Sequence, residues 1–151
     1  MDQDAFRRTY RDVNERYCAY EKCILTNECQ CSQAERFCIA EREGVRCGAD
    51  DAQAQCLEVL MLLREAARFA LRAATEEGVL PHGKAMKIQV GGLRGIRAAL
   101  EPDADTSASI ADVHRLLCQA SDAFGGLANL PYSQIMRDVA AYRVKKRSRR
   151  K

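Results

Sequence analysis

The sequence predicts an all-α protein, a compact bundle of about five to six short helices with a Cys-rich N-terminal helix–turn–helix region. Three observations support this fold class. Apolar residues recur at intervals of three and four along most of the chain. Capping residues, glycines and prolines separate these periodic stretches. The chain has 151 residues, of which 47% are hydrophobic and 30% charged, a balance typical of one globular domain.

The domain organisation follows from the same pattern. We expect a single helical domain over residues 1–142, with its Cys-rich part at 18–56, followed by a disordered basic tail at 143–151. The N-terminus has no apolar run after a basic start, and no apolar stretch is long enough to cross a bilayer. These features predict a cytoplasmic protein with no membrane span.

The first half of the chain is expected to form three helices. The first covers residues 4–25, where apolar and tyrosine side chains make one narrow stripe: Phe6, Tyr10, Val13, Tyr17, Tyr20 and Ile24. Ser32 followed by Glu35 has the pattern of a capping box, which predicts that a second helix starts there. A third helix is expected to begin at Asp50 or Asp51 and to run to about Thr75.

The second half is expected to add three more helices. Residues 84–100 form the fourth, although a short strand at 87–90 is a competing interpretation because glycines follow it. The glycines at 91, 92 and 95 favour close helix packing over phosphate binding. Ser109 with Asp112 caps the fifth helix, and Asn129 followed by Pro131 opens the sixth.

Eight cysteines are the most informative feature for function, and six of them lie between residues 18 and 47. In a cytosolic chain of this length, clustered thiols more often bind metal or perform redox chemistry than form disulfides. The turn at 26–31 between the first two expected helices allows neighbouring thiols to point in one direction. The preferred ligands are Cys23, Cys29, Cys31 and Cys38. Cys18 and Cys47 serve as alternates or as a second site.

An all-sulfur ligand set favours an iron–sulfur cluster, with zinc as the alternative cofactor. Both histidines, His82 and His114, lie far along the chain, so a site in the first third would be all-sulfur. No C-x2-C pair is present, and therefore neither the zinc-ribbon spacing nor the common ferredoxin spacing occurs. Cys56 and Cys118 lie on apolar stripes and are expected to pack as small core residues.

Basic residues define a second candidate surface. Seven of the 24 basic residues lie in 143–151, so the net charge of +3 depends on this tail. An anionic partner such as a nucleic acid could bind the tail together with a basic helix face. This set consists of Lys84, Lys87, Arg94, Arg97, Lys145, Lys146 and Arg147.

The leading functional hypothesis is a small cytosolic cysteine-rich protein that binds a metal or an iron–sulfur cluster. It would act in electron transfer or as an accessory to a redox enzyme, with a redox protein as its partner. One alternative is a helical interaction module, with structural zinc or free thiols, that docks nucleic acid through the basic tail. A second alternative is a thiol redox sensor. No catalytic residue is predicted.

Overall fold

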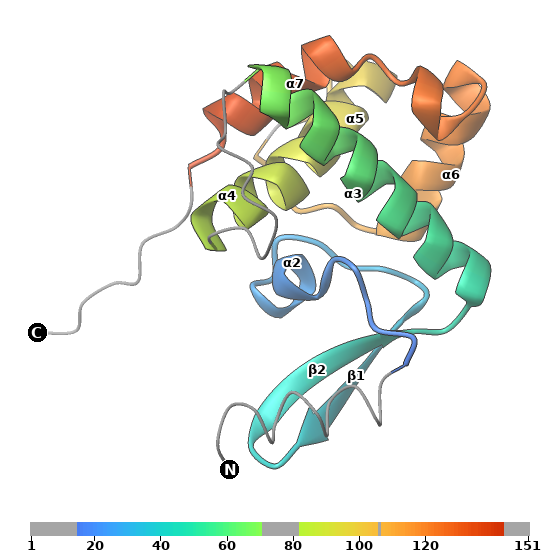
Figure 1. The fold of residues 1–151 in the computed structure, drawn as a ribbon, viewed down its shortest axis with the longest axis vertical. Coiled ribbons are helices and arrows are strands. Elements are labelled where there is room, and N and C mark those ends of the chain that lie inside the picture. Colours follow the sequence, from blue (N-terminus) through green and yellow to red (C-terminus); the bar gives the residue numbers. More distant parts are fainter. Residues whose placement is uncertain (1–14, 71–81, 106, 144–151) are drawn as a thin grey trace, which may run out of the picture.

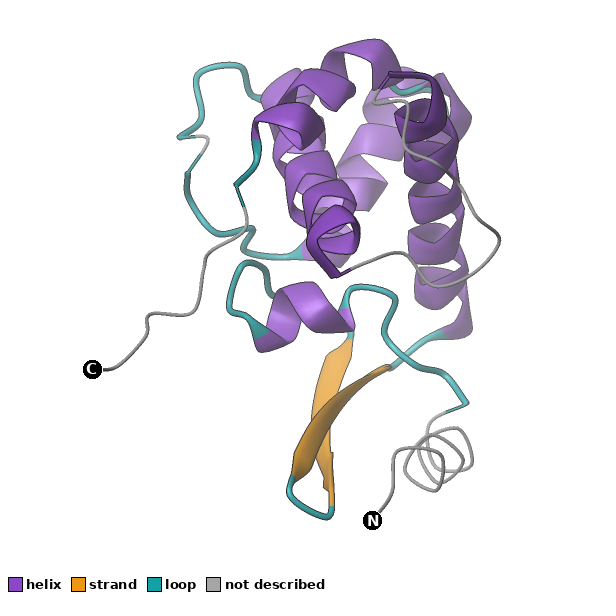
Figure 2. Cartoon of the chain, turned by 60° about the vertical axis from the view of Figure 1, so that its left-hand side comes forward, coloured by secondary structure: helices purple, strands orange, loops and turns teal. Residues whose placement is uncertain are grey.

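Helices dominate the protein, as the sequence predicts, but a two-stranded hairpin is also present. The structure is a computed structural model that describes residues 15–70, 82–105 and 107–143. In Figures 1 and 2 the longer helices form one body, the hairpin projects from it, and a short helix lies between them. The elements are α2 (Glu21–Leu25), β1 (Ala34–Ile39), β2 (Arg42–Cys47), α3 (Asp50–Ala70), α4 (His82–Met86), η1 (Lys87–Gly91), α5 (Gly92–Leu100), α6 (Val113–Phe124), η2 (Leu127–Asn129) and α7 (Tyr132–Ala141).

The hairpin corrects the prediction of a helix that starts at Ser32. β1 and β2 pair antiparallel, from Ala34 opposite Cys47 to Ile39 opposite Arg42. Ala40 adopts a positive φ of 55° in the tight turn between the strands. The purely helical fold class and the N-terminal helix–turn–helix are therefore wrong in this region.

Hydrogen bonding on both edges of β2 explains why the strand forms. β1 pairs with one edge, and residues 16–18 pair with the other. The Cys18 N–H donates to the Val45 carbonyl at 2.9 Å, and the Cys47 N–H donates to the Arg16 carbonyl at 2.7 Å. These bonds satisfy backbone groups that would otherwise be buried without partners, since Val45 is fully buried. The local capping signal gives way to this tertiary pairing.

The same pairing breaks the first predicted helix. Residues 15–20 form turns and an isolated bridge between Tyr17 and Arg46, and within the described residues 15–25 the helical part is α2 alone. Its residues Cys23 and Ile24 are buried. The part of the predicted helix at 4–14 lies outside the described residues.

The later helices form near their predicted positions, but α6 and α7 begin at Val113 and Tyr132, three or four residues after the predicted caps Ser109 and Asn129. α3 begins at Asp50, and its predicted end near Thr75 lies outside the described residues. Residues 82–100 are helical throughout as α4, η1 and α5, so the competing strand at 87–90 does not form. Asp112 caps α6, because its side chain accepts from the Arg115 N–H at 3.5 Å. Gly125, with a φ of 75°, ends this helix in the left-handed conformation.

Glycines allow η1 and α5 to approach α7 closely, as predicted. A Cβ added at Gly91 would lie 2.6 Å from the Val139 Cα, and one at Gly95 would lie 3.0 Å from the Ile135 Cα. The core is fully buried at these contacts, where Leu93 and Ile135 have no exposed surface. The glycine-rich stretch thus has a structural explanation in helix packing.

Candidate metal centre

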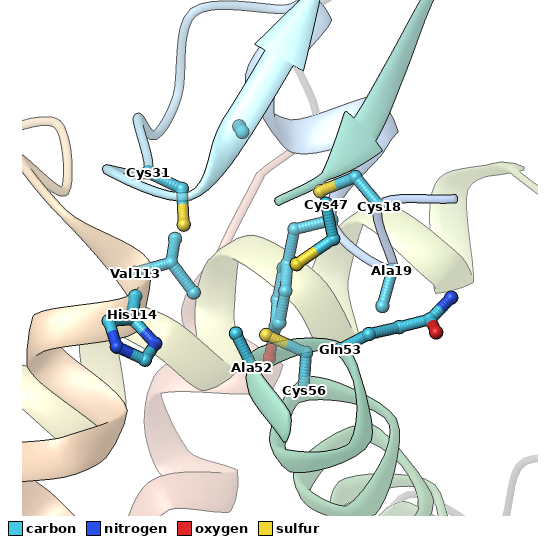
Figure 3. A pocket seen from close by; sticks show the side chains of 11 residues that line it. Cys18, Ala19, Cys31, Cys47, Ala52, Gln53, Cys56, Val113 and His114 are labelled. Carbon is cyan, nitrogen blue, oxygen red and sulfur yellow. The ribbon is translucent and has the colours of Figure 1, made fainter. Parts of the chain in front are cut away.

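Four cysteines from four separate segments line one small cavity between the hairpin and the helices (Figure 3). Cys18 precedes α2, Cys31 precedes β1, Cys47 ends β2, and Cys56 lies in α3. Figure 3 shows their sulfur atoms directed toward a common space. The cavity has a volume of about 10 Å³, close to the space of one water molecule. Much of the remaining wall consists of small or apolar side chains: Ala19, Ala34, Ala52 and Val113.

The four thiols surround this space without forming a shell for a single ion. Among the described residues, no group of three or more His, Cys, Asp or Glu side chains could hold one metal ion as they stand. Zn–S bonds of about 2.3 Å would place the sulfurs of a tetrahedral zinc site about 4 Å apart. Nevertheless, the charges of Cys18, Cys31 and Cys47 all raise the pKa of Cys56. The thiols therefore lie close enough to affect one another's ionisation.

The β2 edge pairing holds Cys18 and Cys47 in place. Both residues take part through their own backbone N–H groups in the hydrogen bonds between residues 16–18 and β2. The Cys47 thiol also donates to the Ala49 carbonyl at 3.3 Å. Cys56 lies one helical turn after Ala52, which is buried and lines the same cavity. The hairpin-to-helix junction thus brings Cys47 and Cys56 together.

Contacts with the start of α6 hold Cys31 in place. The Ser32 N–H donates to the Asp112 carboxylate at 2.9 Å, and the Val113 N–H donates to the Gln30 carbonyl at 2.8 Å. These bonds fix the chain on both sides of Cys31 against the N-terminus of α6. Asp112 is therefore both a helix cap and an anchor for a cavity thiol.

Asp112→Ala is expected to lower the free energy of unfolding by about 1–2 kcal/mol, as measured by urea denaturation, because an N-cap is lost. Asp112→Asn keeps an acceptor oxygen and should cost less. Burial raises the pKa of Asp112, but hydrogen bonds from Ser32, Arg115 and His114 outweigh it and leave the pKa below 3.8. The charge therefore stabilises the fold above pH 3.8, and this contribution is lost as the pH falls through the lowered pKa. The natural protein and Asp112→Asn should therefore become closer in free energy of unfolding as the pH falls. A difference that stays constant with pH would contradict this role of the charge.

Burial keeps three of the four cavity thiols, those of Cys18, Cys31 and Cys56, protonated at neutral pH. Burial, with a smaller contribution from the neighbouring Cys31 and Cys47, raises the pKa of Cys18 to about 12. The pKa of Cys56 is also raised, mainly by burial. A thiolate that forms here needs a positive charge nearby, because both burial and the other thiols oppose its ionisation. A metal cation would supply that charge and release the protons.

Backbone N–H groups donate to two of the cavity sulfurs. The Tyr20 N–H hydrogen-bonds to Cys18, and the N–H groups of Gln33 and His114 hydrogen-bond to Cys31. Each bond lowers the pKa of its thiol, although burial has the larger, opposite effect. N–H groups directed at sulfur are the contacts that tune metal–thiolate centres. The backbone is thus arranged to stabilise negative charge on two of the four sulfurs.

Two buried polar groups on the cavity wall have no hydrogen-bond partner among the described residues. They are the hydroxyl of Tyr20, a fully buried residue, and Nδ1 of His114. Buried polar atoms are normally paired, so both groups are available to a ligand or a neighbouring thiolate. The other ring nitrogen of His114 lies 3.8 Å from the sulfur of Cys118. Cys118 therefore lies next to the cavity wall and is only partly buried.

The ligand set expected from the sequence is not brought together as one group. Cys38 is exposed on β1, opposite Glu43. Cys23 and Cys29 are fully buried in the core, where their hydrogen bond and then burial raise the pKa of Cys29. Cys31 alone of the preferred four lines the cavity, together with the expected alternates Cys18 and Cys47.

Cys56 is the cavity residue that the sequence pattern hides. It is 9% exposed and belongs to the hydrophobic core, as expected, but its thiol also lines the cavity. A core cysteine and a buried metal ligand would both lie on an apolar helical stripe, so the pattern does not distinguish them. The useful signal is the short connection from Cys47 to Cys56, which becomes informative only once residues 42–47 are recognised as a strand.

The basic residues expected to bind an anionic partner have different surroundings. Arg94 pairs with the buried Glu28 at 3.3 Å and lies over the Tyr142 ring. Arg97 donates to the carbonyls of Asp105 and Ser109. Lys84 is exposed and Lys87 half-buried. The tail residues Lys145, Lys146 and Arg147 lie outside the described residues.

Comparison with models of known protein families, with curated proteins and with solved structures finds no match to this chain. None of the helices in the described ranges has both the length and the apolar character needed to cross a membrane. Functional inference therefore depends on the chemistry of the cavity.

Proposed function

We propose that the protein binds an iron–sulfur cluster through Cys18, Cys31, Cys47 and Cys56, and acts in electron transfer or as an accessory to a redox enzyme. One observation carries this proposal: four thiols from separate segments line a single cavity. Four thiolates are the usual ligand set for such clusters. This set replaces the one expected from the sequence and keeps its all-sulfur chemistry.

The spacing of the thiols favours a cluster over a single ion. The sulfurs affect one another's pKa, yet no three of them could hold one ion as they stand. The ligands of a cluster are separated by its inorganic core, so they are naturally farther apart than those of zinc. A cluster is larger than the cavity of about 10 Å³, so its binding requires the segments that carry the four cysteines to move apart.

The surroundings of the cavity suit a redox centre. Small and apolar side chains line much of the cavity, while the N–H groups of Tyr20, Gln33 and His114 stabilise charge on sulfur. When bound, a cluster would accept and donate single electrons. All eight cysteines are free thiols, which agrees with a reducing compartment such as the cytosol. A redox protein is the partner that this function requires.

A single zinc is the second candidate, because the cavity volume of about 10 Å³ is closer to that of one ion. Zinc binding would require the cysteine side chains to rotate inward until their sulfurs are about 4 Å apart. It would stabilise the fold but would not transfer electrons, since Zn²⁺ has no redox chemistry.

Anaerobic purification followed by reconstitution with iron and sulfide tests the proposal. We expect a brown protein with about four irons and about four sulfides per chain, and visible absorption that is bleached by dithionite. Zinc bound tightly in place of iron would assign the cavity to the second candidate. A colourless protein that retains neither metal would refute both.

A further inference from the structure

An exposed apolar face lies directly beside the proposed cluster. The described part of the chain leaves four large hydrophobic side chains exposed, three of them on α3: Tyr17, Leu57, Met61 and Phe69. Met61 is 52% exposed. A groove of about 370 Å³ runs along this face. It is lined by Tyr17, Ala19, Leu57, Leu60, Met61, Arg64, Glu65 and Arg68.

The groove and the thiol cavity share a wall. Ala19 lines both. Tyr17 immediately precedes Cys18, and Leu57 immediately follows Cys56, so two groove residues adjoin two proposed ligands in sequence. The side-chain amide of Gln53 donates to the Tyr17 carbonyl at 2.9 Å, which ties this segment to α3. A protein bound in the groove would lie close to the cavity sulfurs.

The composition of the groove indicates the kind of partner. Tyr, Met and Arg are enriched at protein–protein interfaces, where an apolar centre is surrounded by polar groups. Here Tyr17, Leu57 and Met61 supply the apolar centre. Arg64 and Arg68 outnumber the single acid Glu65, so the groove is complementary to an acidic surface.

We propose that this groove docks an acidic one-electron carrier protein, which exchanges electrons with the cluster through the wall formed by Ala19. The inference rests on the proposed function. One electron leaves the reduced carrier and enters the oxidised cluster, and no covalent bond forms or breaks. Electron transfer slows steeply with distance, and this groove gives a partner a short approach to the site.

Stopped-flow reduction of the reconstituted protein by a flavodoxin, an acidic flavin carrier, tests the docking. Arg68→Glu is expected to lower the second-order rate about tenfold at low salt and to weaken its dependence on ionic strength. Arg137→Glu is the matched control, because it makes the same charge change at an exposed position on α7. Met61→Glu should also slow the reaction.

Iron content, measured in every variant, separates the two proposals. A protein without iron refutes the cluster itself. Full iron content with equal rates for Arg68→Glu and Arg137→Glu overturns the docking groove and leaves the cluster proposal intact.

Cross-linking distinguishes the carrier protein from any other occupant of the groove. A photoreactive phenylalanine analogue at position 61 should capture the flavodoxin in a salt-sensitive manner. Capture of a second copy, or of residues 1–14 of the same chain, in the presence of the carrier would overturn the proposal.

Discussion

Cys47→Ala is expected to abolish iron retention in the reconstituted protein, whereas Cys38→Ala should retain the full amount. Cys47 is 8% exposed, lines the thiol cavity and is held there by the β2 pairing, so its loss leaves three thiols around the space. Cys38 is exposed on β1 and lies outside the set that lines the cavity. Iron and sulfide analysis, with visible circular dichroism, measures the outcome.

These two variants also separate the structural ligand set from the set expected from the sequence. The sequence-based set includes Cys38 and treats Cys47 as an alternate, so it predicts the opposite ranking. Loss of iron in Cys38→Ala together with retention in Cys47→Ala would contradict the cavity assignment. Cys56→Ser provides a second cavity variant, since it replaces the sulfur by an oxygen and changes the side-chain volume at position 56 only slightly. Far-ultraviolet circular dichroism establishes that each variant remains folded.

Cys23→Ala extends the same comparison to the buried core. Cys23 is fully buried in α2 and hydrogen-bonds with Cys29, so its truncation removes core contacts. A large-to-small change of this size should lower the free energy of unfolding by about 1 kcal/mol. We nevertheless expect full iron retention. A stable Cys23→Ala protein without iron would show that the core pair participates in metal binding.

The sequence predicts the helices of the second half well because their signals are local. α6 has an acidic N-cap at Asp112 and a glycine at its C-terminus, and both act within a few residues. The glycines before and within α5 likewise indicate close packing, although the partner helix can be identified only in the fold. Local periodicity is sufficient wherever a helix buries one face against its neighbours.

The hairpin could not be predicted in this way, because its stability comes from distant residues. β2 is paired on its outer edge by residues 16–18, far from the capping signal at Ser32 and Glu35. Within the hairpin, Arg46 lies over the Phe37 ring at 4.6 Å, a contact across the strands. Tertiary hydrogen bonds therefore override a local helical preference.

Thiol density indicates the chemistry of the candidate site but not its members. Cys29 and Cys31 are two residues apart, yet the first is buried beside Cys23 and the second lines the cavity. Cys18 and Cys56 line the same cavity because residues 16–18 pair with β2, and β2 leads into α3. The ligand set thus depends on the strand pairing, so a sequence-based prediction that misses the strands also selects the wrong cysteines.

Gly91→Ala is expected to lower the free energy of unfolding by about 2 kcal/mol or more. The added Cβ would lie 2.6 Å from the Val139 Cα and 3.0 Å from the Asp138 carbonyl oxygen. Both are backbone atoms of α7, so η1 and α7 must move apart. Overpacking of this kind costs about 3 kcal/mol, and the better helix propensity of alanine offsets about 1 kcal/mol of it. Urea denaturation measures the difference.

Gly83→Ala is the matched control, because it introduces the same methyl group into α4 with no atom within 4 Å. There only the propensity gain remains, and the variant should be more stable than the natural chain by about 0.5–1 kcal/mol. Opposite signs for the two variants would establish that contact with α7, and not helix propensity, requires glycine at position 91. Equal effects would show that η1 and α7 are not packed at this distance.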